Sequence, residues 1–232
     1  MRIAVVSDIH GNLTAFDAVL RDLEQTSPDL IFHAGDLADG GSNPREIADK
    51  IRDLGWQGVV GNADEMLFRP ASLGEFAAQV PQMNPLLPLI EAIAAWTREQ
   101  LGEDRMRWLS GLPMTRIEGP LTLVHASPAS CWRVPPNDEE FSSLGTPVAV
   151  YAHLHRPSIR KFGLTTIVNT GSVSLSYDGD PRASYLLLTD SAPEIRRVAY
   201  DVAKEEKALL SSGVPHAPWI AKMLKSASFE AP

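Results

Sequence analysis

Seven polar side chains that commonly bind metal ions lie in five short segments of this chain. The segments are SDIHGN, AGD, GNAD, LVHASP and YAHLHRP, and their candidate ligands are Asp8, His10, Asp36, Asn62, His125, His153 and His155. Two carboxylates, one amide and four imidazoles are too many ligands for one tetrahedral zinc ion. They suit two divalent ions that are bridged by a carboxylate. The residue types therefore indicate a two-metal centre.

An apolar run rich in Ile, Val or Leu leads into each of these segments. The runs, written with their ligands, are IAVVSDIH, LIFHAGD, GVVGNAD, LTLVHAS and VAVYAHLH. Such runs are typical of buried strands. Because sites in open α/β sheets form where strands end, we expect the ligands to meet at one edge of the fold.

The order of the motifs, D-x-H, G-D, G-N, H and then H-x-H, resembles the calcineurin-like metallophosphoesterase superfamily. The likeness extends from Met1 to about Ser172 and is greatest to the small prokaryotic phosphodiesterase branch of that superfamily. It implies that Asp36 bridges two metal ions. It also implies a first metal bound by Asp8, His10 and His155, and a second bound by Asn62, His125 and His153.

The chain departs from the family pattern at three positions. Where the third family motif usually has a histidine that protonates the leaving group, this chain has Ala63. Alanine cannot donate a proton, so we expect substrates with good leaving groups, such as aryl phosphodiesters, to react best. Val124 and Ala152 replace two glycines of the family pattern, which adds bulk but removes no ligand.

The composition predicts one large globular domain of 232 residues. The formal net charge of −8 disfavours long nucleic acid and anionic membranes as partners. No apolar run approaches the ~20 residues of a membrane span. The chain begins directly with a strand pattern, so we expect no signal peptide, and the single Cys131 fits a reducing compartment. We therefore expect a cytoplasmic protein; its oligomeric state is not indicated.

The order of the predicted elements indicates an α/β fold, with two stacked mixed β-sheets flanked by helices as an αββα sandwich. The first sixty residues read as a βαβαβ unit, with helices after Asn12 and from Pro44 to about Leu54. Residues 65–112 lack strand alternation and predict a helical insertion, either packed on the domain or placed as a cap over the site. Seven strand patterns follow Met114, and we expect them to form a largely antiparallel second sheet. One or two helices are expected after Asp201.

Three residues are candidates for substrate binding: Asn62, Arg133 and Arg156. Arg156 follows the ligand His155 and could hold a phosphate oxygen, while Arg133 lies on the loop after HASPASC. We interpret His33 as a buried core histidine and Asp39 as a turn residue.

The imidazole-rich ligand set favours Mn²⁺, Fe, Zn²⁺, Co²⁺ or Ni²⁺ over Mg²⁺ and Ca²⁺, and we place Mn²⁺ first. The first hypothesis is a dinuclear phosphodiesterase that acts on small phosphate esters. A phosphomonoesterase or a (di)nucleotide polyphosphate hydrolase would use the same metals. A non-catalytic metal-binding interaction scaffold is the alternative from another class, and the seven intact ligands argue against it.

Overall fold

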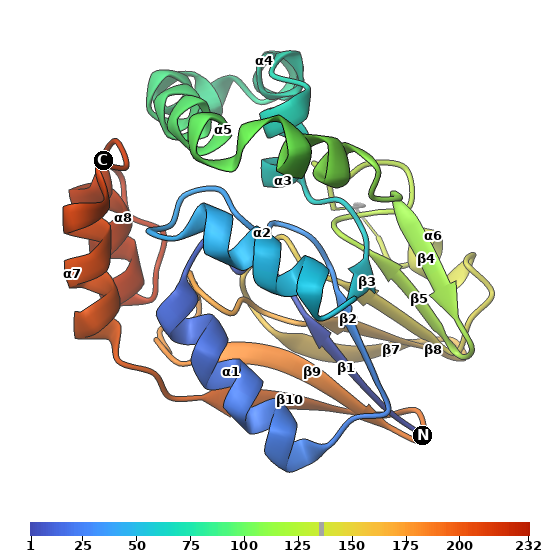
Figure 1. The fold of residues 1–232 in the computed structure, drawn as a ribbon. Helices are drawn as coiled ribbons and strands as arrows, with labels where there is room; N and C mark the ends of the chain where they lie inside the picture. The colour runs from blue at the N-terminus through green and yellow to red at the C-terminus, as the bar shows by residue number, and fades with distance from the viewer. Residues whose placement is uncertain (135–136) are drawn as a thin grey trace.

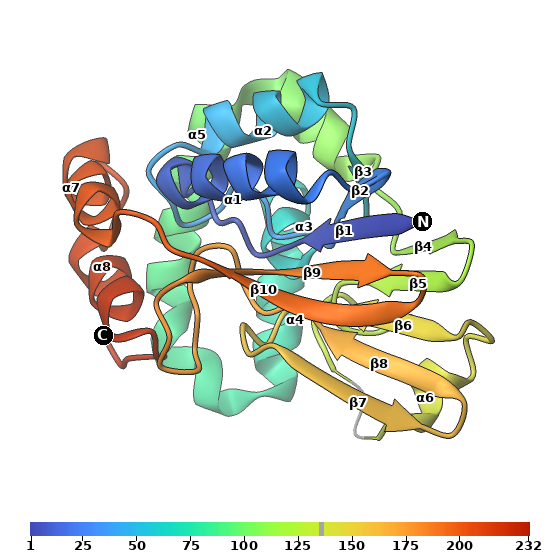
Figure 2. The same cartoon turned by 90° about the horizontal axis from the view of Figure 1, so that it is seen from below.

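Two five-stranded mixed sheets stack face to face in this protein (Figures 1 and 2). The computed structural model describes residues 1–134 and 137–232. The first sheet has the order β10-β9-β1-β2-β3 and the second has the order β4-β5-β6-β8-β7. A buried cluster that includes Val5, Phe32, Leu123 and Val150 joins the inner faces of both sheets. The α/β class with two mixed sheets is thereby confirmed.

The first half of the first sheet is the predicted βαβαβ unit. Its elements are β1 (Arg2–Val6), α1 (Leu13–Thr26), β2 (Leu30–His33), α2 (Pro44–Asp53) and β3 (Gln57–Gly58). The three strands pair in parallel. The Asn12 side chain caps α1 by accepting from the Ala15 amide, 2.8 Å away. The two helices cover the outer face of this sheet (Figure 2).

The expectation of one largely antiparallel second sheet is wrong in two respects. The second sheet consists of β4 (Thr115–Glu118), β5 (Leu121–Val124), β6 (Val148–Tyr151), β7 (Ser158–Phe162) and β8 (Thr165–Asn169). Strand β6 runs parallel to both β5 and β8. Strands β9 (Ala183–Thr189) and β10 (Ala192–Val198) belong to the first sheet instead, because β9 pairs antiparallel with β1. Nearly every residue of β9 is buried, as suits a central strand rather than an edge.

The segment of the chain between β3 and β4 is helical, as expected, and its two ends have different surroundings. It contains α3 (Asn62–Phe68), α4 (Ala71–Gln79), the 3-10 helix η1 (Pro81–Leu86) and α5 (Leu87–Ser110). A positive φ of 69° at Gly102 kinks α5. Beyond the kink, Leu109 is fully buried in the same core cluster as Ile51 of α2. This second half is therefore part of the domain core.

The remaining helices flank the sandwich. They are α6 (Glu139–Ser142), which packs on the second sheet through Phe141, and α7 (Val202–Ser212) and α8 (Ala217–Ser226) at the C-terminus. Figure 2 shows α7 and α8 side by side, near the carboxyl ends of β1 and β2. In the part of the chain that the structure describes, no helix has both the length and the apolar character needed to span a membrane.

Candidate metal centre

The structure brings all seven predicted ligands together at the loops that follow β1, β2, β5 and β6, and at the start of α3. Ligand atoms of Asp8, His10, Asp36 and His155 lie within 4.8 Å of one another. Beside them, Asn62 Oδ1 lies 2.9 Å from His125 Nε2 and 2.7 Å from His153 Nδ1. The site is thus built from two adjoining clusters of side chains.

One carboxylate oxygen belongs to both clusters. Asp36 Oδ2 lies 3.7 Å from His10 Nε2 in the first cluster and 3.4 Å from His125 Nε2 in the second. The other oxygen, Oδ1, accepts the Ala63 backbone N–H at 2.8 Å. The carboxylate is therefore fixed with a single oxygen directed between the two histidines, which is the position of a bridging ligand.

The clusters place hydrogen-bond acceptors against one another. Three histidines direct Nδ1 at backbone carbonyls that can only accept: His10 at Asp39, His125 at Ala34 and His155 at Leu175. In the neutral ring each Nε2 then carries a lone pair.

These lone pairs face other acceptors. His10 Nε2 and His155 Nε2 are 3.3 Å apart, and the buried Asp8 Oδ1 has no hydrogen-bond partner. Positive charge must lie between such groups, and two divalent ions fit this donor set. The histidine–carbonyl contacts would hold each ring in the ligand tautomer.

Without metal, protons supply part of that charge. Burial by itself lowers the pKa of His125, but the Asp36 carboxylate outweighs it and raises the pKa to about 9. Burial likewise opposes a raised pKa at His155, where the Asp8 carboxylate prevails. The pKa of His153 falls to about 4 because of burial and then of repulsion from His125. Metal binding at neutral pH must therefore displace protons.

Five of the seven ligands have left-handed backbone conformations. The φ angles are 50° at Asp8, 46° at His10, 54° at Asp36, 67° at His153 and 55° at His155. Such conformations are uncommon outside glycine and concentrate at functional sites, where the surrounding structure enforces them. The apolar runs predict where these loops begin but not this backbone geometry.

Gly61 and Asp64 hold the Asp36 loop, and the sequence interpretation missed the role of Asp64. Its carboxylate accepts backbone N–H groups from Asp36 at 2.8 Å, Leu37 at 2.9 Å and Gly61 at 3.0 Å. A Cβ atom on Gly61 would lie only 2.0 Å from Asp36 Oδ1, so only glycine fits there. An acidic residue two positions after the ligand Asn62 was the available signal.

The loop VNTGSV supports the site from the other side. Asn169 Nδ2 donates to the Ala152 carbonyl at 2.6 Å, and Ser172 Oγ donates to the Asp8 carbonyl at 2.9 Å. Ser7 Oγ donates to Asp8 Oδ2 at 2.7 Å. These bonds leave the other oxygen of Asp8 facing His155.

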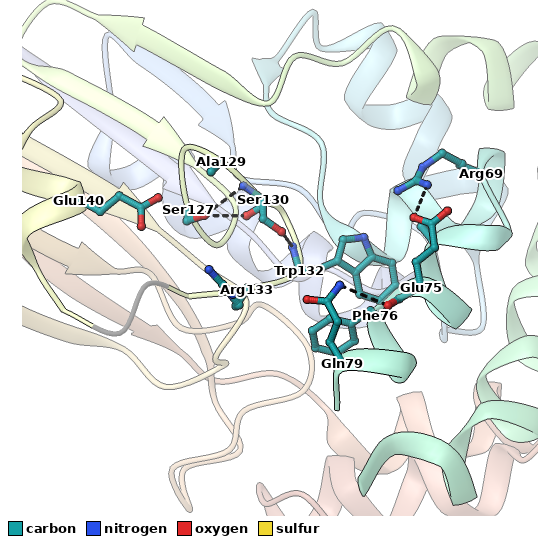
Figure 3. A pocket seen from close by; sticks show the side chains of 11 residues that line it. Arg69, Glu75, Phe76, Gln79, Ser127, Ala129, Ser130, Trp132, Arg133 and Glu140 are labelled. Carbon is teal, nitrogen blue, oxygen red and sulfur yellow. Dashed lines mark hydrogen bonds and ion pairs between the residues drawn. The ribbon is translucent and has the colours of Figure 1, made fainter. Parts of the chain in front are cut away.

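Neither arginine candidate reaches the cavity over the metal centre. Arg156 is exposed, and its Nε donates to the Tyr177 carbonyl at 2.7 Å. Arg133 is exposed in a neighbouring pocket of about 310 Å³, which shares Phe76 and Trp132 with the metal cavity (Figure 3). Their part in substrate binding stays a prediction, whereas Asn62 lines the metal cavity directly.

Three further polar residues have clear surroundings. His33 is fully buried beside Trp108, and burial followed by repulsion from Arg116 lowers its pKa to about 3, as suits a neutral core histidine. Asp39 does more than form a turn, because its backbone carbonyl orients His10 and the residue lies at the cavity lining. Burial and then the Glu65 carboxylate raise the pKa of the Cys131 thiol, which disfavours the nucleophilic thiolate form.

Comparison with known proteins agrees with this geometry. Residues 1–192 match the family model for the calcineurin-like phosphoesterase superfamily domain. The chain therefore belongs to that superfamily, whose members include metal-dependent phosphoesterases, and its His/Asp cluster is the kind that binds divalent metals.

Individual relatives cover most of the chain. The uncharacterized protein MJ0912 of Methanocaldococcus jannaschii is 31% identical, with 96% of each chain covered. Phosphodiesterase YfcE of Escherichia coli K12 is 27% identical, over 81% of this chain and 87% of its own. The crystal structure of a metallophosphoesterase from Sphaerobacter thermophilus superposes with a TM-score of 0.80 at 29% identity, covering 98% of this chain and 99% of that one.

Proposed function

We propose that this protein hydrolyses small phosphate esters with two divalent metal ions, and that phosphodiesters are its substrates. The observation that carries the proposal is Asp36 Oδ2, which faces His10 of one cluster and His125 of the other. The similarity to a phosphodiesterase, YfcE, supports the choice of diesters over monoesters. We place Mn²⁺ first among the metals and the cytoplasm as the compartment.

Each predicted ligand has a role at one or both metal ions. Asp8, His10 and His155 would hold the first ion, Asn62, His125 and His153 the second, and Asp36 both. When bound, two such ions counter the negative charge of the phosphate and lower the pKa of water from 15.7 toward ~7. The backbone carbonyls behind His10, His125 and His155 keep their rings oriented. Ala63 offers no proton to a leaving group, so aryl esters should react best.

Metal content and turnover test the proposal together. The wild-type protein saturated with Mn²⁺ should bind two equivalents and hydrolyse bis-aryl phosphate faster than mono-aryl phosphate. Asp36→Asn should weaken both ions because it removes the shared charge, whereas His155→Ala should mainly weaken the first. Less than one bound equivalent together with no activity would refute the proposal. Faster turnover of the monoester would instead identify a phosphomonoesterase.

A further inference from the structure

A cavity of about 380 Å³ opens over the metal centre, and its walls are apolar. Its floor is formed by candidate ligands, among them Asp36 and Asn62. The walls come from two regions far apart in the sequence. Leu86 and Ile90 line it from the helical segment, while Trp219 and Met223 line it from α8. A group bound to the metal ions would extend directly between these walls.

Aromatic rings form two further parts of the wall. Phe76 and Trp132 pack together with ring centroids 5.2 Å apart, and Figure 3 shows these two rings side by side. Tyr177 stacks on the ligand His155 with centroids 4.7 Å apart, and Phe229 packs edge-on against Tyr177. Flat apolar or aromatic groups bind well between such surfaces.

The cavity offers little to a charged group. Among residues 1–134 and 137–232, no lysine or arginine lines it, and apart from the candidate ligands its one acidic residue is Asp39. Two arginines contact the outside of the cavity wall and donate to backbone carbonyls there, Arg98 to Met66 and Arg156 to Tyr177. Arg69 and Arg133 line the neighbouring pocket behind Phe76 and Trp132. Arg69 is already paired there with Glu75 at 2.7 Å (Figure 3). A second phosphate or carboxylate would therefore lose its hydration without gaining a partner.

We propose that the substrate is a phosphodiester with a bulky apolar or aromatic ester group and no charge beyond the reacting phosphate. The inference rests on the proposed function, because the metal centre must bind the phosphate. It disfavours dinucleoside polyphosphates, whose additional phosphates would face apolar walls. The candidate ligands and the apolar residues line one cavity. A phosphate at the ligands would therefore place its ester group against the apolar residues.

The first test varies one ester arm and keeps the leaving group constant. Methyl, butyl and hexyl esters of p-nitrophenyl phosphate would be compared with a hexyl arm that ends in a carboxylate. Wherever the arm fits, kcat/KM should rise by up to about fourfold for each methylene, the gain from burying one CH₂. The terminal carboxylate should lower kcat/KM about tenfold or more relative to hexyl, because no cation meets it.

The outcomes separate the two proposals. Equal kcat/KM across the series, or no effect of the carboxylate, would overturn the apolar substrate class while leaving the phosphodiesterase intact. No turnover of any ester with Mn²⁺ would instead count against the proposed function. In that case the binding of a non-hydrolysable ester would test whether the cavity accepts apolar groups.

Binding is measured without catalysis by the tryptophan fluorescence of Trp132 and Trp219, which both line the cavity. The probe is hexyl methylphosphonate, which resists hydrolysis. The reference is methyl methylphosphonate, in which a methyl ester replaces the hexyl ester. Ile90→Lys places a charge in the wall and should weaken hexyl binding about tenfold or more. The matched control Ile117→Lys, at a position on β4 that is 62% exposed, should not.

Leu86→Lys provides a second wall variant should the first fold poorly. Equal binding by the wall variants and the control would contradict the inference. So would light scattering that shows a dimer which these wall variants dissociate, because a second copy of the chain would then occupy the cavity.

Discussion

Asp64→Asn tests whether a buried carboxylate that is not itself a ligand maintains the metal centre. In the wild type, Asp64 Oδ2 accepts from Asp36 and Gly61, while Oδ1 accepts from Leu37. An asparagine has one acceptor oxygen. If that oxygen replaces Oδ2, the amide NH₂ faces the Leu37 N–H, and both of these buried donors are left without an acceptor.

The magnitude follows from those donors. Each buried donor without a partner costs about 1–3 kcal/mol, so the substitution should cost roughly 2–6 kcal/mol before any offset. A neutral amide avoids one penalty, since burial and repulsion from Asp36 raise the pKa of Asp64 to about 6. Because each pKa unit corresponds to about 1.4 kcal/mol, this offset is roughly 3 kcal/mol, and we expect a net loss of up to about 3 kcal/mol in the free energy of unfolding. Affinity for Mn²⁺ should fall by about 10–100-fold, as for other residues that orient ligands.

Urea unfolding and Mn²⁺ titration measure the two effects. The matched control is Asp104→Asn, at an exposed carboxylate 2.8 Å from Arg52, which should leave both the urea midpoint and metal binding nearly unchanged. If Asp64→Asn unfolds at the wild-type midpoint and binds Mn²⁺ equally well, Asp64 does not hold the Asp36 loop.

Three further predictions concern the same centre. Gly61→Ala should abolish binding of both ions by metal analysis, because its Cβ would lie 2.0 Å from Asp36 Oδ1, whereas Gly74→Ala, whose Cβ meets open space, should retain them. Mn²⁺ affinity should rise as the pH rises toward about 9, because the metal must displace the proton of His125, whose pKa is about 9; calorimetry in two buffers should show proton release on binding. The stability that this proton gives the metal-free protein is complete below pH 6.5 and disappears as the pH rises through about 9. Ala63→His should raise alkyl relative to aryl ester turnover, since a general acid contributes up to ~10²–10⁴-fold for poor leaving groups; an unchanged ratio at equal metal content would show that another group supplies the proton.

Local patterns in the sequence predicted the features that depend on residue type and short spacing. The strand before Asp8 and the Asn12 cap both lie where those patterns place them. Sheet membership depends on partners distant in the chain, so β9 was assigned to the wrong sheet. Its run ASYLLLT identifies a buried strand but carries no information on whether β1 or β8 is its neighbour.

The cavity illustrates the same limit more strongly. The sequence predicts a helical insertion over residues 65–112 and one or two helices after Asp201, but such helices equally suit ordinary core packing. Only the tertiary structure brings Ile90 of the first segment and Met223 of the second into the lining of the same cavity as Asn62. The apolar substrate preference is therefore a property of distant segments, and no single motif contains it.

The metal ligands and the cavity walls are held in place by different kinds of contact. The positions of the ligands are set mainly by the main chain: carbonyls orient three histidines, backbone N–H groups hold Asp36 and Asp64, and Gly61 leaves room for the bridging carboxylate. Such contacts allow few substitutions, since each involves a backbone atom or an absent Cβ. The cavity walls are formed by side chains, where one apolar residue can replace another at modest cost. The metal chemistry is thus fixed by the loops, while the choice of ester can change through the walls without disturbing the metal ligands.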